Sequence, residues 1–204
     1  MLLNLCISFY PFLILNSLFN NYFNKKNSRN LVAAIHALFS VILNGLYLFT
    51  GNYTIGFLSH CLSLGYFSFD LYYMFLFEKI NLLRILFIYH HLASIYMIFN
   101  HHLIYNSHQL LFFGELSNLP SYVVYHYMHN NTEDVCTYII IKMFKKIQKI
   151  VYGIIRIPIM TYILVNMINT LDFTNPDVVK IVTIISPVYM MGLIWTFKLI
   201  CENR

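Results

Sequence analysis

The feature that most constrains this chain is a succession of long apolar runs separated by short polar connections. One helical crossing of a bilayer needs about 20 mostly apolar residues. A helix also satisfies its own backbone hydrogen bonds in lipid. The runs cover residues 2–23, 30–50, 54–77, 82–100, 103–129, 147–171 and 178–200. The sequence therefore predicts an all-α, polytopic membrane protein with about seven transmembrane helices.

Composition supports this prediction and bounds the domain organisation. Hydrophobic residues make up 59% of the chain and charged residues 10%, against about half and a quarter in soluble domains. The basic residues punctuate the apolar runs and form no basic surface patch with stacking aromatics, which excludes a nucleic-acid-binding protein. We expect an N-terminal anchor helix with a cytosolic basic loop over 1–28, a transmembrane domain over 29–200 and a cytosolic tail over 201–204.

The distribution of basic residues predicts the orientation. If the N-terminus lies on the lumenal or outer side, Lys180 falls in an outer loop and Arg156 lies within a span. The other eleven of the thirteen basic residues are then cytosolic, as the positive-inside rule requires. They are Lys25, Lys26, Arg29, Lys79, Arg84, Lys142, Lys145, Lys146, Lys149, Lys198 and Arg204. The C-terminus is accordingly predicted to be cytosolic.

Two local patterns interrupt the regular succession of spans. Residues 130–146 form the longest connection and hold a short apolar stretch bounded by lysines, which favours an interfacial helix on the anionic leaflet. Pro11, Pro120, Pro158 and Pro187 fall within spans and are expected to kink them.

Ionisable side chains within spans are costly, and by default they mark a functional site. The candidates are His36, Asp70, His90, His91, Glu115 and Arg156. All but Glu115 fall about 9–14 Å from the cytosolic end of their helices, at 1.5 Å per residue. Adjacent His90 and His91 point about 100° apart, so one imidazole is expected to face a given ligand.

Two interpretations of this polar layer remain open. In the structural one, Arg156 pairs with Asp70 or Glu115, and the histidines join helices by hydrogen bonds. In the functional one, the surplus of acids and histidines forms a site.

A metal site is not predicted. No HxxHH box occurs, and His101, His102 and His108 belong to the outer end, opposite His126 and His129. The four cysteines form neither a CxxC pair nor a zinc pattern.

Five short segments, in order, resemble the TLC-domain family, which includes ceramide synthases, translocon-associated TRAM proteins and CLN-type proteins. They are 29–37 (RNLVAAIHA), 65–71 (GYFSFDL), 90–95 (HHLASI), 115–120 (ELSNLP) and 192–195 (GLIW). The resemblance covers about residues 29–200. It implies six helices in a barrel around a lipid-accessible cavity, in the endoplasmic reticulum membrane.

In ceramide synthases the paired histidines lie at the centre of acyl transfer from acyl-CoA to a sphingoid base. By resemblance His90 and His91 would be the reactive pair. The synthase pattern then continues to a His-Asp and a further Asp, whereas this chain has Glu115, Ser117 and Asn118. The chain is therefore more similar to the family members that are not ceramide synthases.

Three functional hypotheses follow. The first is a protein that binds membrane lipid in a polar cavity and affects lipid composition, without a bound cofactor. Its lipid-binding residues would be His36, Ser94, Ser117, Asn118 and Arg156. A trafficking or translocation partner is a further alternative, and the sequence indicates no particular protein partner.

The remaining hypothesis is a lipid acyltransferase with acyl-CoA as co-substrate. His90 or His91 would act as general base or transient acyl acceptor, and Asp70 or Glu115 would orient the imidazole.

Overall fold

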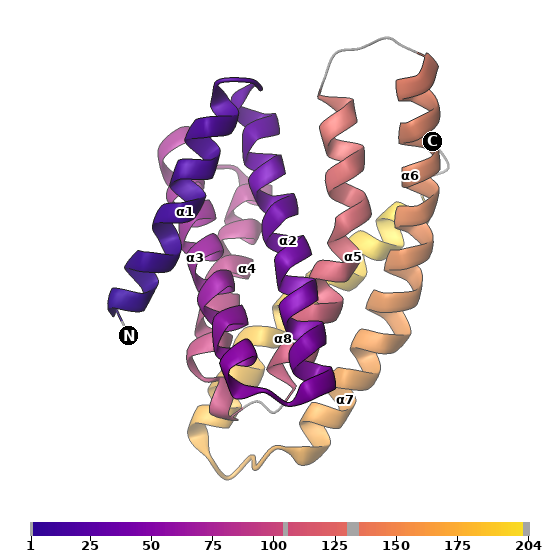
Figure 1. Ribbon diagram of the computed structural model, residues 1–204. Coiled ribbons are helices and arrows are strands. Elements are labelled where there is room, and N and C mark those ends of the chain that lie inside the picture. Colours follow the sequence, from indigo (N-terminus) through magenta and orange to yellow (C-terminus); the bar gives the residue numbers. More distant parts are fainter. Residues whose placement is uncertain (1, 104–105, 130–134, 202–204) are drawn as a thin grey trace.

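The computed structural model describes residues 2–103, 106–129 and 135–201, with side chains from residue 8 onward. Every regular element in these ranges is a helix (Figure 1). The elements are α1 (Leu2–Asn20), α2 (Lys25–Thr50), α3 (Tyr53–Phe77), α4 (Leu82–Phe99), η1 (His101–Leu103), α5 (Ser107–Met128), α6 (Val135–Ile154), η2 (Ile155–Ile159), α7 (Met160–Thr170) and α8 (Pro176–Cys201). The predicted all-α fold is confirmed, and the predicted runs lie within a few residues of these helices except for 147–171, whose helix begins at Val135.

Local sequence explains where three of the helices begin. An asparagine precedes each of α2, α3 and α4, and its side-chain oxygen accepts a backbone N–H of the first turn, as an N-cap does. The pairs are Asn24 with Asn27, Asn52 with Thr54 and Asn81 with Arg84. At the end of α2, Gly51 adopts φ 67°, and its N–H donates to the carbonyl of Tyr47. A left-handed residue of this kind terminates a helix, and glycine adopts it without steric cost.

In the described part of the chain, four helices are long and apolar enough to cross a membrane. They are α2, α4, the continuous helix Val135–Thr170 and α8. Helix α3 has a similar length, but it carries buried polar residues such as His60, Ser63 and Asp70, which lower its mean hydropathy. The structure thus supports an integral membrane protein.

Residues 135–170 form one helix of 36 residues and not an interfacial helix followed by a separate span. Residues 130–134 of the predicted interfacial segment lie outside the described residues. The expected distortion at Pro158 is confirmed, because this proline lies in the π-helical segment η2. Proline lacks the N–H that a regular α-helical turn needs. Pro11, Pro120 and Pro187 lie inside α1, α5 and α8, which continue through them.

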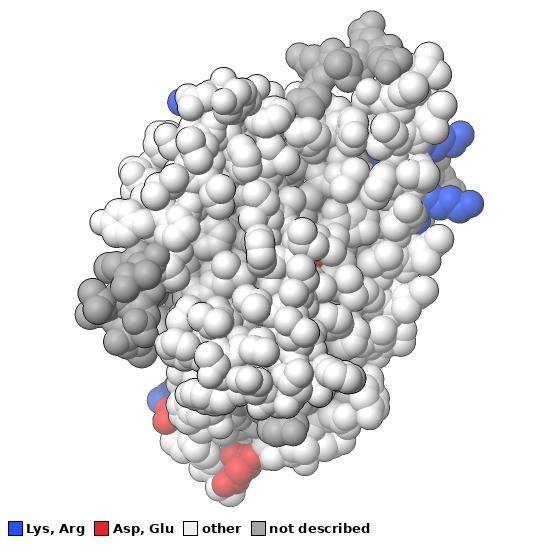
Figure 2. Space-filling view, viewed as in Figure 1, with Lys and Arg blue, Asp and Glu red and all other residues white. Residues whose placement is uncertain are grey.

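The long helices run alternately up and down, and α3 packs against α1, α2 and α4 (Figure 1). We call the end that holds residues 21–24, residues 78–81, the start of α6 and the end of α8 the basic end. Figure 2 shows Lys and Arg side chains along the edge where α6 runs. It shows Asp or Glu at the opposite end, where α7 and α8 are joined. A basic side chain also lies beside these acidic ones, so the separation of charge on this face is partial.

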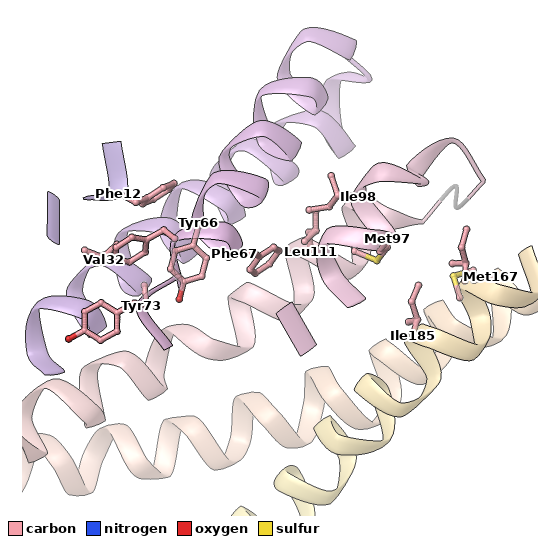
Figure 3. Close-up of a cluster of buried hydrophobic side chains, with 13 residues drawn as sticks. Phe12, Val32, Tyr66, Phe67, Tyr73, Met97, Ile98, Leu111, Met167 and Ile185 are labelled. Carbon is pink, nitrogen blue, oxygen red and sulfur yellow. The ribbon is translucent and has the colours of Figure 1, made fainter. Parts of the chain in front are cut away.

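An apolar core connects the N-terminal helices with the C-terminal ones. Figure 3 shows Phe12 and Tyr66 on one side of this core, Leu111 near its middle, and Met167 and Ile185 on the other side. Helix α1 approaches α3 so closely at Gly65 that a Cβ atom on this residue would lie 2.3 Å from the backbone oxygen of Ser8. This core holds in place the polar side chains that cross between helices.

Candidate functional site

Asp70 on α3 is held by an arginine from α2. The Nε and Nη2 atoms of Arg29 donate to the two carboxylate oxygens of Asp70, at 2.6 and 2.8 Å. The third nitrogen of Arg29 donates to Glu78 at 2.6 Å, and Glu78 also pairs with Arg84. Paired, charge-assisted bonds of this type have a strict geometry. The network therefore links α2, α3 and the start of α4 near the basic end.

His91 on α4 completes this network from the other side. Its Nε2 lies 3.0 Å from Oδ2 of Asp70. A carboxylate only accepts hydrogen bonds, so the imidazole donates from Nε2, and Nδ1 carries the lone pair when the ring is neutral. Nδ1 of His91 is buried and has no hydrogen-bond partner among the described residues. Asp70 thus orients His91 through one ring nitrogen and does not contact the other.

His36 lies fully buried between α2, α3 and α5. Its ring stacks on the ring of Tyr66, with centroids 4.0 Å apart and planes 10° apart. Its Nε2 lies 3.4 Å from the hydroxyl of Ser63, and its Nδ1 lies 3.9 Å from a carboxylate oxygen of Glu115. Ring packing therefore accounts for most of its close surroundings.

A cavity of about 130 Å³ lies between α4, α5, η2, α7 and α8. Most of its lining is apolar, including Phe67, Met97, Leu111, Leu164, Ile185 and Leu193. Polar groups that line it come from α4, α5, η2 and α8. They include His90, Ser94, Glu115, Asn118, Arg156 and Tyr189. An apolar cavity with a few polar groups from different helices is a usual form of a small-molecule site.

Arg156, on the π-helical segment η2, binds two neutral side chains of α5. Its Nε donates to the hydroxyl of Ser117 at 3.0 Å, and its Nη2 donates to the side-chain oxygen Oδ1 of Asn118 at 2.7 Å. The guanidinium also lies over the ring of Tyr152, 4.2 Å from the centroid. The pairing of Arg156 with Asp70 or Glu115 is not found, since no carboxylate of the described chain lies within ion-pair distance of it.

The predicted candidates fall into separate groups and do not share one cavity. His90, Glu115 and Arg156 line the cavity together with Ser94 and Asn118. Asp70 and His91 belong to the charged network, and His36 belongs to an aromatic contact. Ser117 holds Arg156 in place. The predicted divergence of the adjacent histidines is confirmed, because His90 lines the cavity while His91 binds Asp70.

Sequence reasoning missed Arg29 as the partner of Asp70, because its position beside two lysines indicated a basic loop. A signal was present: Arg29 precedes His36 by seven residues, which places both on one face of a helix. The roles of Tyr189 and Gly192 of α8 in lining the cavity were also missed. Their positions depend on how α8 packs against its neighbours.

A second buried polar cluster lies at the end opposite the basic end. The rings of His60 and His108 stack with centroids 4.1 Å apart, and His101 contacts His60 edge-on at 4.7 Å. Nδ1 of His108 lies 2.7 Å from the side-chain oxygen of Asn44, which is fully buried. Over the described residues, no group of three or more His, Cys, Asp or Glu side chains is arranged to hold a metal ion.

No family model, curated protein or solved structure matches this chain.

Proposed function

We propose that this chain is a seven-span membrane protein that holds a lipid in the cavity between α4, α5, η2, α7 and α8, and thereby affects membrane lipid composition. The observation that carries this proposal is the cavity itself. Its lining is apolar apart from a few polar groups, among them His90, Glu115 and Arg156. Such a lining matches a ligand with one apolar chain and one polar head.

The proposal includes a topology. Helices α1, α3 and α5 also cross the membrane, with their polar side chains facing the bundle interior. The basic end faces the cytosol, in accordance with the positive-inside rule, so the N-terminus is lumenal. The membrane is that of the endoplasmic reticulum, as the TLC-like resemblance implies.

A TLC-like barrel of six helices is part of the same proposal. Three TLC-like segments contribute Arg29, Asp70 and His91 to one charged network. The segments that contain Glu115 and Gly192 contribute to the cavity lining. TLC-like segments that are far apart in the sequence thus meet in the charged network and in the cavity lining, which supports the proposal of a TLC-like barrel.

Blocking the cavity tests lipid binding. No atom lies within 4 Å of a Cβ built on Gly114, which lines the cavity, so Gly114→Leu adds bulk into open space. Leu92→Phe is a matched control, because Leu92 is half exposed on α4. Mild extraction followed by native mass spectrometry should find lipid bound to the wild type and the control, and less on Gly114→Leu. Lipid-free wild-type protein would overturn the proposal.

A second candidate function is acyl transfer from acyl-CoA to a lipid acceptor. The observation that favours it is the His91–Asp70 contact, which leaves Nδ1 of His91 without a partner, next to cavity-lining His90. Nδ1 would take the proton of the acceptor as its oxygen or nitrogen bonds to the acyl carbon. The carbon–sulfur bond would then break and CoA leave as the thiol. Lysines at the basic end would attract the phosphates of CoA.

Labelled acyl-CoA separates this candidate from simple binding. Wild-type protein should form a labelled lipid product, and His90→Ala and His91→Ala should form less. The absence of both a labelled product and a labelled acyl-enzyme from the wild type would refute acyl transfer and leave lipid binding standing.

A further inference from the structure

Arg156 uses only part of its hydrogen-bonding capacity. Nε and Nη2 bind Ser117 and Asn118, whereas Nη1 has no hydrogen-bond partner in the described part of the chain. Nη1 lies 3.4 Å from the position that a Cβ on Gly192 would occupy. Both residues line the cavity. Since Gly192 has no side chain, space is left beside this free nitrogen.

Among the described residues, no carboxylate lies within ion-pair distance of Arg156, although Glu115 lines the same cavity. Charged side chains inside a membrane normally pair with one another or face a water-filled cavity. Arg29 follows this rule, because it binds the carboxylates of Asp70 and Glu78. Arg156 instead binds two neutral oxygens and the face of Tyr152. An anion entering the cavity would supply the charge that the described residues do not place beside Arg156.

Glu115 sets a second requirement for a ligand of this cavity. It lines the same cavity, but its nearest polar contacts are Asn118 at 3.4 Å and His36 at 3.9 Å. Arg156 and Glu115 therefore face one cavity without forming an ion pair. A ligand would satisfy both residues if its anionic group bound Arg156 and a hydrogen-bond donor of the same ligand faced Glu115. The apolar lining suits the part of a single acyl or alkyl chain that lies next to the headgroup.

We propose that the cavity selects a single-chain amphiphile whose anionic headgroup, a carboxylate or a phosphate, binds the free nitrogen of Arg156. This inference rests on the proposed lipid-binding function and names the ligand class. It assigns Ser117 and Asn118 the role of holding the guanidinium in place, and it assigns Gly192 the role of leaving room for the headgroup.

Three probes test it: oleic acid, lysophosphatidic acid with the same chain, and oleyl alcohol. Each is titrated into the full-length protein in phosphatidylcholine nanodiscs. Trp195 is the only tryptophan of the chain and lies three residues after Gly192, so its fluorescence reports binding. The hydrogen bond between Arg156 and an anionic headgroup should make at least one of the two acids bind about tenfold more tightly than oleyl alcohol. Comparison of the two acids shows whether the site prefers carboxylate or phosphate.

Variants at position 156 connect this preference to the arginine. Arg156→Gln should lose about tenfold in anion affinity and leave alcohol affinity unchanged, and Arg156→Lys should retain part of the preference. Lys180→Gln is the control, because Lys180 is exposed and pairs with Asp177 on the surface. It should bind like the wild type.

The outcomes separate this inference from the function on which it rests. Equal binding of alcohol and acids by the wild type would overturn the anionic headgroup and leave lipid binding intact. Equal losses of all three probes in Arg156→Gln would show that Arg156 only supports the fold. If no probe binds the wild type, both the inference and lipid binding are wrong. Should Arg156→Gln not fold, the wild-type preference and Arg156→Lys still decide the question.

Discussion

Two buried histidine clusters lie at opposite ends of this bundle and are built in different ways. Near the basic end, His91 binds the carboxylate of Asp70, which is itself held by Arg29. At the other end, His60 and His108 stack on each other, and Asn44 binds His108 through a neutral amide. Helix α3 contributes to both clusters. The comparison teaches that the partner, and not the residue type, decides whether a buried histidine belongs to an ionic network or to ring packing.

The ionic cluster should be the more sensitive to loss of one member. Asp70→Asn removes the charge that faces Arg29 and should lower the free energy of unfolding by about 3 kcal/mol. Glu78 still binds Arg29, which keeps the loss at the lower end of the usual range for a broken buried pair. Denaturant unfolding in detergent micelles measures this change. Asp177→Asn, in an exposed pair, should leave the midpoint unchanged, and equal effects would contradict the comparison.

The neutral cluster should lose less when its hydrogen bond is removed. His108→Phe keeps a ring against His60 and Tyr47, but it leaves the oxygen of Asn44 without its donor. An unsatisfied buried acceptor of this kind costs about 2 kcal/mol. The same unfolding measurement applies. A loss as large as that of Asp70→Asn would show that the opposite end also depends on charge.

Close packing of the neutral cluster can be tested separately. A Cβ on Gly56 would lie 2.7 Å from the ring of Tyr47 and 3.2 Å from Nε2 of His108. Gly56→Ala should therefore destabilise by about 1 kcal/mol, after the gain in helix propensity partly offsets the overpacking. Gly114→Ala is the control, because a Cβ there meets nothing within 4 Å. If Gly56→Ala stabilised the protein instead, the rings of Tyr47 and His108 would have to shift without cost, and close packing of the neutral cluster would be disproved.

The smallest expected effect is the coupling between the two clusters. Asp70 and His60 lie ten residues apart on α3, which is about 15 Å along a helix. They share no partner among the contacts of the described chain. The losses in Asp70→Asn and His108→Phe should then add to within about 0.5 kcal/mol in the double variant. A larger deviation would mean that α3 transmits strain from one end to the other.

Much of the helical architecture could be predicted because its causes are local. Apolar runs of membrane length predict helices, and asparagines such as Asn24 and Asn81 begin them. Pro158 marks the distorted turn for the same reason. The continuity of Val135–Thr170 was not predicted, because lysines within an amphipathic helix resemble the end of a span.

The candidate site was predictable only in part. Consecutive residues of a helix point in different directions, so the sequence alone separates His90 from His91. It does not say which of them faces a cavity, because that depends on the rotation of α4 against α3 and α8. The same limit explains why the sequence left open a pairing of Arg156 with a carboxylate, whereas Arg156 binds Ser117 and Asn118.

By itself, the sequence determined the helical class, the membrane character and several of the polar residues that lie inside the bundle, among them His36, Asp70 and His91, since these follow from hydropathy and periodicity. Only the tertiary structure decided the partners. It joined Arg29 to Asp70, and it placed Arg156 in a cavity with Glu115 but outside ion-pair distance of every described carboxylate. The physical reason is that helix rotation and packing set the distances between side chains on different helices, and no local pattern records them.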